Sequence, residues 1–295
     1  MFYTYNDGAN REDLLDLITN IDPVNNYLLK NLGTTKATGI RHEWTYDTLP
    51  SVTAGTVSGQ VEGFTPTYAN ATNPTRDANY CMILSSEWEV SRTEQKVLAA
   101  GAADNRFAYE QDKAMKHWAN QAENAILHGT LATGTGSAGR QMKGIKRFAS
   151  TLATSFSATT IVEADFRDFL GNGWSQGVEL DTVIVPKTLK NRIDTFTAGN
   201  TKYIEAAEKR VIGFIDVYES AYGVITVVKH RFALDTAGNR DLIMFQSDKL
   251  FVSYLDKPHM EDMAKTSDSD KGIVVGELTV EVRHEKAVSW VRNVL

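Results

Sequence analysis

The sequence predicts an α+β protein that combines one long helix, one long polar hairpin and a compact mixed region. Between 91 and 129, apolar residues recur at steps of three and four, the spacing of one face of an α-helix. Aromatic residues fall on every second position in parts of the segment 39–80, which favours strands. From about 151 to 255, helical and strand patterns alternate, and two more alternating strands close the chain.

The long helix has the clearest pattern in the chain. Ser91-Arg-Thr-Glu94 matches a capping box, in which Ser91 is the N-cap and Glu94 reaches back to it. Gly129 supplies a stop, and a helix over 91–129 would be roughly 55 Å long at 1.5 Å per residue. Gly101 predicts a kink. A half-buried strand, YCMILSSEWEV, precedes this helix, and its single apolar stripe predicts that it lies across a sheet.

The segment 39–80 predicts a long hairpin. One arm is IRHEWTYDTL, the return arm is QVEGFTPTYANA, and PSVTAGTVSG forms the tip. His42-Glu43 begins like the H-E-x-x-H helix of zinc metalloproteases, but Tyr46 occupies the second histidine position. Trp44 and Tyr46 alternate as in a strand, and the segment has too few aliphatic residues to bury a core. We therefore expect another surface to stabilise this hairpin.

The remaining segments complete the expected order of elements. Residues 1–38 predict an arm with one short helix, REDLLDLITNI, and residues 130–148 predict a Gly-rich linker. Two helices are expected at EADFRDFLGNG and KTLKNRIDTFT. Strands are expected at DTVIVP, RVIGFIDVYE, YGVITVVKH, DLIMFQS, KLFVSYL, GELTVEVRH and AVSWVRNV, the last two joined by a turn at Glu285-Lys286.

Composition excludes several classes of protein. The 295 residues are 42% hydrophobic and 23% charged, which is ordinary for a globular protein. A net charge of −6 and a pI near 5.6 argue against a dedicated binder of nucleic acid or of anionic membranes. The single cysteine, Cys81, predicts a buried and unreactive thiol. Neither a signal peptide nor a membrane span is expected, so we expect synthesis and assembly in a cytoplasm.

Sequence motifs that resemble catalytic or cofactor-binding motifs lack the flanking elements that such sites need. Gly134-Thr-Gly136-Ser-Ala-Gly139 matches the dinucleotide fingerprint, but a helix precedes it where a strand is required. Gly173-Trp-Ser175-Gln-Gly177 matches the nucleophile elbow of hydrolases, but it lies between a helix and a strand, in reverse order. The six histidines form no close ligand pair. No catalytic, cofactor or metal site is therefore expected.

One basic cluster could meet phosphate groups. It comprises Arg140, Lys143, Lys146 and Arg147. Four cations in eight residues would give non-specific, salt-dependent contact with nucleic acid. No aromatic residues are interleaved, so base stacking is not expected. A solvated loop or a contact with the acidic edge of a neighbouring subunit is the alternative.

Three stretches together resemble the major capsid proteins of tailed double-stranded-DNA bacteriophages. They are RHEWTYDTL followed by VEGF, then VSRTEQKV with YEQDKAMKHWANQAENAILHG, and finally HMEDMAKTSDSDKGIVVGELTVEVRHEKAVSWV. The resemblance covers nearly the whole chain and depends on the order of all three. The same fold builds encapsulin nanocompartments and the floor of herpesvirus capsids.

The resemblance implies a division of the chain. Residues 1–38 would be an N-terminal arm, 39–80 the extended loop, and 81–150 with 256–295 a peripheral domain that carries the long spine helix of about 91–129. Residues 151–255 would be the axial domain. The chain would form hexamers and pentamers of an icosahedral virion shell around double-stranded DNA. A portal protein and scaffolding or decoration proteins would be its partners, with no membrane and no cofactor.

The resemblance also implies which residues lie between subunits. Aromatic anchors and register-setting charges of the extended loop would contact the neighbour: Arg41, Glu43, Trp44, Tyr46, Asp47, Glu62 and Phe64. The basic cluster of 140–147 would lie near the inner surface. Three alternatives stay open, namely an encapsulin-type shell with an enzyme cargo, a serine hydrolase that uses Ser175, and an all-β tail-fibre or receptor-binding protein.

Overall fold

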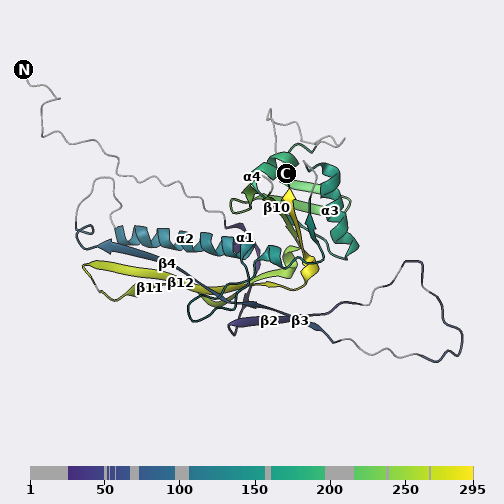
Figure 1. Cartoon of the computed structure of the whole chain (residues 1–295), viewed down its shortest axis with the longest axis horizontal. Helices are drawn as coiled ribbons and strands as arrows, with labels where there is room; N and C mark the ends of the chain where they lie inside the picture. The colour runs from purple at the N-terminus through teal and green to yellow at the C-terminus, as the bar shows by residue number, and fades with distance from the viewer. Residues whose placement is uncertain are drawn as a thin grey trace, which may run out of the picture.

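The computed structural model describes residues 26–49, 52, 54–56, 58–66, 73–96, 106–156, 161–196, 216–236, 239–265 and 267–294. These residues form a four-stranded sheet, a seven-stranded sheet and a two-stranded ribbon, shown in Figure 1. The helix expected within 11–21 lies outside the described residues. Within the described part, none of the helices combines the length and the apolar character needed to cross a membrane.

The four-stranded sheet has the order β1-β11-β12-β4. Its strands are β1 (Gly33–Lys36), β11 (Leu250–Met263), β12 (Ser269–Val282) and β4 (Met82–Ser91). β1 runs parallel to β11, and the other pairs are antiparallel. Buried and exposed residues alternate along β4, which confirms the strand expected before the long helix.

Helix α2 (Arg106–His128) lies across this sheet, as expected, and Figure 1 shows it running beside β4 and β12. Its buried stripe includes Ala114, Trp118, Ala122 and Ile126. The Trp118 indole donates a hydrogen bond of 3.0 Å to the carbonyl oxygen of Leu84 on β4. This bond satisfies a buried polar group while the ring itself packs in the core.

Two glycines of β12 allow large rings to lie directly on its backbone. A Cβ added to Gly272 would overlap the Trp88 ring, and one added to Gly276 would meet the Trp118 ring at 2.8 Å. Neither contact is compatible with a real side chain. Glycine at these positions is therefore what permits the close contact between β12 and the two indoles.

The expected start of the long helix at Ser91 is wrong. Ser91 is the last residue of β4 and pairs with Ser269, and residues 92–96 form turns. The Ser91 hydroxyl does accept a hydrogen bond from the Glu94 amide at 3.2 Å, but that bond closes a turn after a strand. The described helix begins at Arg106 and its 23 residues span roughly 35 Å. Gly101 lies outside the described residues.

The seven-stranded sheet has the order β5-β13-β10-β6-β8-β7, and β9 pairs with β10 outside that path. The strands are β5 (Ala153–Ser155), β6 (Thr182–Val185), β7 (Val217–Ser220), β8 (Gly223–Lys229), β9 (Asp235–Thr236), β10 (Asn239–Phe245) and β13 (Val288–Val294). Helices α3 (Glu163–Ser175) and α4 (Lys187–Ile193) occur where the sequence predicts them. Their buried residues Phe166 and Leu189 share a core with Leu242 and Met244 of β10.

The two C-terminal strands do not pair with each other as expected. β12 belongs to the four-stranded sheet, while β13 pairs with β10 and β5 in the other sheet. The short helix η4 (Glu285–Ala287) occupies the expected turn and takes the chain from one sheet to the other. β11 starts at Leu250, after the short helix η3 (Ser247–Lys249), and continues through residue 255.

The expected Gly-rich linker is mostly exposed up to residue 141, but its last residues enter the core. Met142, Ile145 and Phe148 are buried, and the short helix η2 (Ile145–Arg147) lies among them. Their spacing of three residues is that of a tight helix with one apolar face. The glycines at 134, 136 and 139 lie in the preceding loop, where the Thr135 and Ala138 backbones bond to each other.

A short helix, α1 (Tyr27–Asn31), lies within the segment expected to be an irregular arm. Its amides at Leu28 and Leu29 donate to the carboxylate of Glu123 on α2, at 2.7 and 3.1 Å. His230, in the loop after β8, bonds to the same fully buried carboxylate at 3.0 Å. Glu123 therefore ties together the N-terminal segment, the long helix and the seven-stranded sheet.

Candidate functional site

The extended segment begins as a two-stranded ribbon, not as a zinc-binding helix. Strand β2 (Arg41–Tyr46) pairs antiparallel with β3 (Thr75–Tyr80), with Arg41 opposite Tyr80 and Tyr46 opposite Thr75. The hairpin is confirmed, but the return strand is 75–80 and not the expected 60–71. Val61 to Phe64 form a turn, in which Gly63 has a φ of 78° that favours glycine.

The described residues between β2 and β3 project away from the rest of the molecule (Figure 1). Figure 1 shows the described loop residues running beyond the ribbon, clear of both sheets. Leu49 is 93% exposed, Val61 75% and Phe64 50%. Apolar side chains gathered on one projecting loop are typical of a surface that another protein covers.

The base of the ribbon, in contrast, is fixed to its own chain. Trp44 is buried, and its ring centre lies 6.0 Å from that of Phe148. The Tyr46 ring lies 4.9 Å from His284 in an edge-on arrangement. The expectation that Trp44 and Tyr46 anchor a neighbour is therefore corrected for Trp44, which has little surface left to offer. The sequence could not distinguish an inward from an outward anchor.

Asn79 is the most fully bonded residue of this base. Its side-chain amide donates to the carbonyl oxygens of Lys143 and Val280, at 3.0 and 2.9 Å. Its side-chain oxygen accepts from the amides of Lys143 and Tyr80, at 2.8 and 2.9 Å. All four bonding positions of a buried amide are thus used. The side chain connects β3 to β12 and to the segment before η2.

A second polar cluster holds β2 on the sheet through Glu281 of β12. His42 and Thr35 bond to one carboxylate oxygen at 3.1 Å each, and Arg283 donates to the other at 2.9 Å. Burial alone would raise the pKa of Glu281, but the hydrogen bonds from Arg283, His42 and Thr35 outweigh it and lower that pKa. A carboxylate is therefore the form that the cluster stabilises.

Charged residues of the hairpin that were expected to align it with a neighbour are also bonded within the chain. Glu43 forms ion pairs of 3.1 Å with Arg41 beside it and with Arg76 on β3. These pairs are exposed, so each contributes little stability, and they fix the ribbon rather than a neighbour. Asp47 and Glu62 lie exposed beyond the ribbon. They and Phe64 are the expected contact residues that lie beyond the ribbon.

The expected basic cluster is divided by the fold. Lys146 is buried and bonds to Asp241 at 2.8 Å, so it is not part of an exposed surface. Arg140 is half-buried and bonds to Glu277 and to the carbonyl oxygen of Cys81. The Lys143 ammonium lies 4.2 Å from the centre of the Phe148 ring. Only Arg147 of the four is exposed.

Among the residues that the structure describes, those of the catalytic-type motifs do not lie beside partners that would activate them. Ser175 ends α3, and its hydroxyl donates to the carbonyl oxygen of Asn172 at 2.8 Å. Burial, with a smaller contribution from the nearby Glu277, raises the pKa of the Cys81 thiol to about 11, as expected for an unreactive thiol. In the part of the chain that the structure describes, no three metal-ligating side chains converge.

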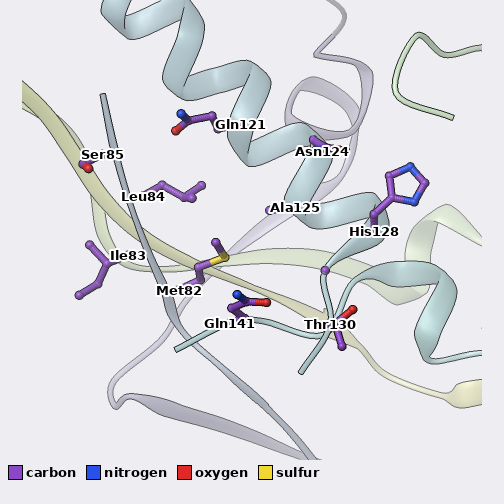
Figure 2. Close-up of a pocket in the computed structure, with 11 residues that line it drawn as sticks. Met82, Ile83, Leu84, Ser85, Gln121, Asn124, Ala125, His128, Thr130 and Gln141 are labelled. Atoms are coloured by element: carbon purple, nitrogen blue, oxygen red, sulfur yellow. The ribbon is translucent and has the colours of Figure 1, made fainter. Parts of the chain in front are cut away.

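A pocket of about 580 Å³ lies between α2, β4 and the loop that follows α2. Figure 2 shows Gln121 and Asn124 of α2 on one side and Met82 to Ser85 of β4 on the other. His128 is the one titratable residue in its lining, and its ring points away from Met82 and Gln141 to bond with the carbonyl oxygen of Phe232. The lining therefore supplies amide and aliphatic contacts but no acid–base pair.

Comparison with known proteins agrees with this architecture. The family model described as SU10 major capsid protein matches residues 1–295. The capsid of the native GTA particle is similar at a TM-score of 0.70 and 7% identity, covering 99% of this chain and 98% of that one. The capsid of Cyanophage A-1(L) is similar at 0.70 and 12% identity, covering 97% of both chains.

The SrpI encapsulin of Synechococcus elongatus PCC 7942 is similar at a TM-score of 0.60 and 10% identity, covering 97% of this chain and 92% of that one. At such identities these likenesses concern the fold alone. No curated protein is similar to the chain in sequence.

Proposed function

The chain belongs to the SU10 major capsid protein family and forms the shell of a bacteriophage capsid, and from this premise we propose that its projecting hairpin joins neighbouring subunits. The observation that carries the proposal is the contrast along the hairpin. Its base is fixed to its own chain by Trp44 and Asn79, while Leu49, Val61 and Phe64 beyond the ribbon are exposed. A fixed base with an uncovered apolar end is suited to reach a second copy.

The energetics support an intermolecular role. Ordering the backbone of a projecting loop costs roughly 1–2 kcal/mol per residue, and burial of apolar surface returns about 25 cal/mol per Å². The described loop residues cover little of their own apolar surface. Contact with a neighbour supplies the missing burial, with Phe64 as the aromatic anchor and Asp47 and Glu62 as charges at its rim.

Repetition of one such contact builds the shell. The hairpin contacts a different surface on its neighbour, so the interface is heterologous and closes into rings by rotation. We assign these rings to the hexamers and pentamers of an icosahedral capsid assembled in a host bacterial cytoplasm. The shell encloses double-stranded DNA and admits a portal protein, and scaffolding or decoration proteins are further partners.

The subunit has a structural role, and two alternatives are separated by simple measurements. An encapsulin-type shell is suggested by the SrpI likeness and would contain a protein cargo instead of nucleic acid. A hydrolase that uses Ser175 would lose activity in Ser175→Ala. The Ser175 hydroxyl bonds to a helix carbonyl, which is no general base.

The test replaces the exposed apolar residues of the hairpin and leaves its base intact. We expect Leu49→Ser with Phe64→Ser to keep the folded subunit but abolish shells, seen by negative-stain electron microscopy and light scattering. The control is Leu131→Ser with Val162→Ser, two other exposed apolar positions. Shells of normal size from the hairpin variant would contradict the proposal. Neighbouring genes are co-expressed if the parent chain needs a scaffold.

A further inference from the structure

Helix η2 and strand β13 place three cations around one indole ring. The Lys146 ammonium lies 5.2 Å from the centre of the Trp290 ring, and the guanidinium carbons of Arg147 and Arg292 lie 6.0 and 5.6 Å from it. Two of these residues belong to the basic cluster expected from the sequence, whereas Arg292 lies far along the chain. The fold thus builds a compact cationic site that sequence spacing does not show.

Among the described residues, two of the three cations form no ion pair with a carboxylate. Lys146 is buried and paired with Asp241 at 2.8 Å. Arg147 and Arg292 are both exposed, and across the described ranges no acidic side chain forms an ion pair with either. Glu285, on the turn before β13, instead accepts hydrogen bonds from Ser150 and Thr151. Two guanidinium groups beside one ring repel each other, so this site favours an anion.

The geometry indicates which kind of anion fits. A guanidinium held near an indole by cation–π attraction keeps N–H groups that can bind two oxygens in one plane. Phosphate oxygens match this arrangement. The Trp290 ring is only partly exposed and its Nε1 is buried, so the ring does not serve as a stacking platform for bases. The contact is therefore with a sugar-phosphate backbone and does not depend on sequence.

We propose that Arg147 and Arg292, held beside Trp290, bind phosphodiester groups of the DNA inside the shell. The proposal rests on the proposed function, since it needs DNA inside the shell, and it adds that this face of the subunit lies toward that DNA. Two contacts per subunit are weak alone, but they repeat over every subunit of a shell. Such a surface holds DNA loosely against the wall in a chain whose net charge is otherwise −6.

The test measures binding of a short fluorescent DNA duplex to the full-length chain at several salt concentrations. The logarithm of the binding constant falls linearly with the logarithm of the salt concentration. Arg147→Gln with Arg292→Gln is expected to make this negative slope shallower by about two per subunit. Arg147→Lys with Arg292→Lys keeps both charges and is expected to keep most of that slope. The control Arg92→Gln removes an exposed arginine that is paired with Asp268, and its slope is expected to equal that of the parent chain.

Shell formation is scored by electron microscopy on the same preparations. An unchanged salt slope in the double glutamine variant overturns the proposal. Loss of shells with unchanged DNA affinity also overturns it and assigns the site to an acidic face of another subunit. Absence of shells from the parent chain is a failure of the proposed function, which the binding measurement on unassembled chain keeps separate.

Discussion

At the scale of single residues, Asn79 is the polar side chain on which the base of the hairpin depends most. Asn79→Asp keeps its shape but replaces two donors by an oxygen that faces the carbonyls of Lys143 and Val280. We expect the free energy of unfolding to fall by about 2–4 kcal/mol, because buried acceptors are left facing one another. Denaturant unfolding measures this. Asn124→Asp, at an exposed position on α2, is the matched control and should change stability by under about 0.5 kcal/mol.

His128 gives the structure a predictable sensitivity to acid. Burial lowers the pKa of His128, and Lys146 and His230 lower it further against the opposing effects of the Phe232 carbonyl and Asp241. The unfolded chain therefore takes up the proton at a higher pH than the folded chain does. Stability is full above the ordinary histidine pKa of about 6.5 and falls as pH drops below it.

The corresponding variant is His128→Gln, whose side-chain amide can still donate to the carbonyl oxygen of Phe232. We expect its unfolding free energy to depend less on pH between about 7 and 5 than that of the parent chain. Unfolding curves at several pH values give the comparison. Equal pH dependence in the two proteins would show that other groups carry the effect. His284 is the first to consider, since burial lowers its pKa as well.

At the scale of elements, the hairpin has an inner and an outer aromatic residue, and the two should behave differently. Trp44→Ala opens a cavity beside Phe148 and is expected to cost about 3–5 kcal/mol of stability in the single subunit. Phe64→Ala removes a half-exposed ring and is expected to leave that stability within about 0.5 kcal/mol while impairing shell formation. Paired unfolding and light-scattering measurements test both. Equal loss of subunit stability in the two variants would contradict the division into base and contact region.

The attachment of α1 to α2 is a second element-scale prediction. Leu28 and His230 bond to one Glu123 oxygen and Leu29 to the other, so Glu123→Gln, which turns one of these oxygens into an NH₂ group, must lose at least one of the bonds to the α1 amides or to His230. We expect faster hydrogen exchange at Leu28 and Leu29, because α1 has only five residues and its N-cap Asn26 makes no side-chain capping bond. Exchange at Ile126, on the buried face of α2, serves as the internal reference. Unchanged exchange at α1 would show that packing alone holds it.

Local patterns predicted most elements but not their partners. The alternation in β4 and the helical spacing of α3 predicted both correctly, because each buries one face against a single core. Ser91 misled because a capping box and a turn after a strand use the same short-range bond. The ladder between β12 and β4, which extends to Ser91, decides between them, and pairing between distant strands leaves no local signal.

The candidate site shows the same limit. That the segment 39–80 makes a hairpin followed from its alternating aromatic residues, yet which of them face inward depends on Phe148 and His284 far along the chain. Asn79 carries no signal in the sequence, since one asparagine in a polar strand is unremarkable until its four partners are known. Arg292 was missed for the same reason. Contacts between segments distant in sequence define both sites.

At the scale of the whole molecule, the subunit consists of a body formed by two sheets and a hairpin that projects from it. The four-stranded sheet with α2 and the seven-stranded sheet with α3 and α4 are joined through η2, η4 and the Glu123 cluster. Figure 1 shows the described residues of the hairpin extending away from this body. The central claim is that this extension contacts another copy of the chain.

The most direct measurement of that claim is cross-linking from the hairpin in assembled shells. Gln60→Cys introduces one exposed thiol beside Val61 and leaves Phe64 in place, and the native Cys81 is buried with its pKa raised to about 11. A photoreactive label on the introduced thiol is activated in shells made from a mixture of isotope-labelled and unlabelled chains. We predict cross-linked peptides that pair labelled with unlabelled chains, and far fewer in unassembled subunits. Cross-links confined to single chains in intact shells would contradict the account.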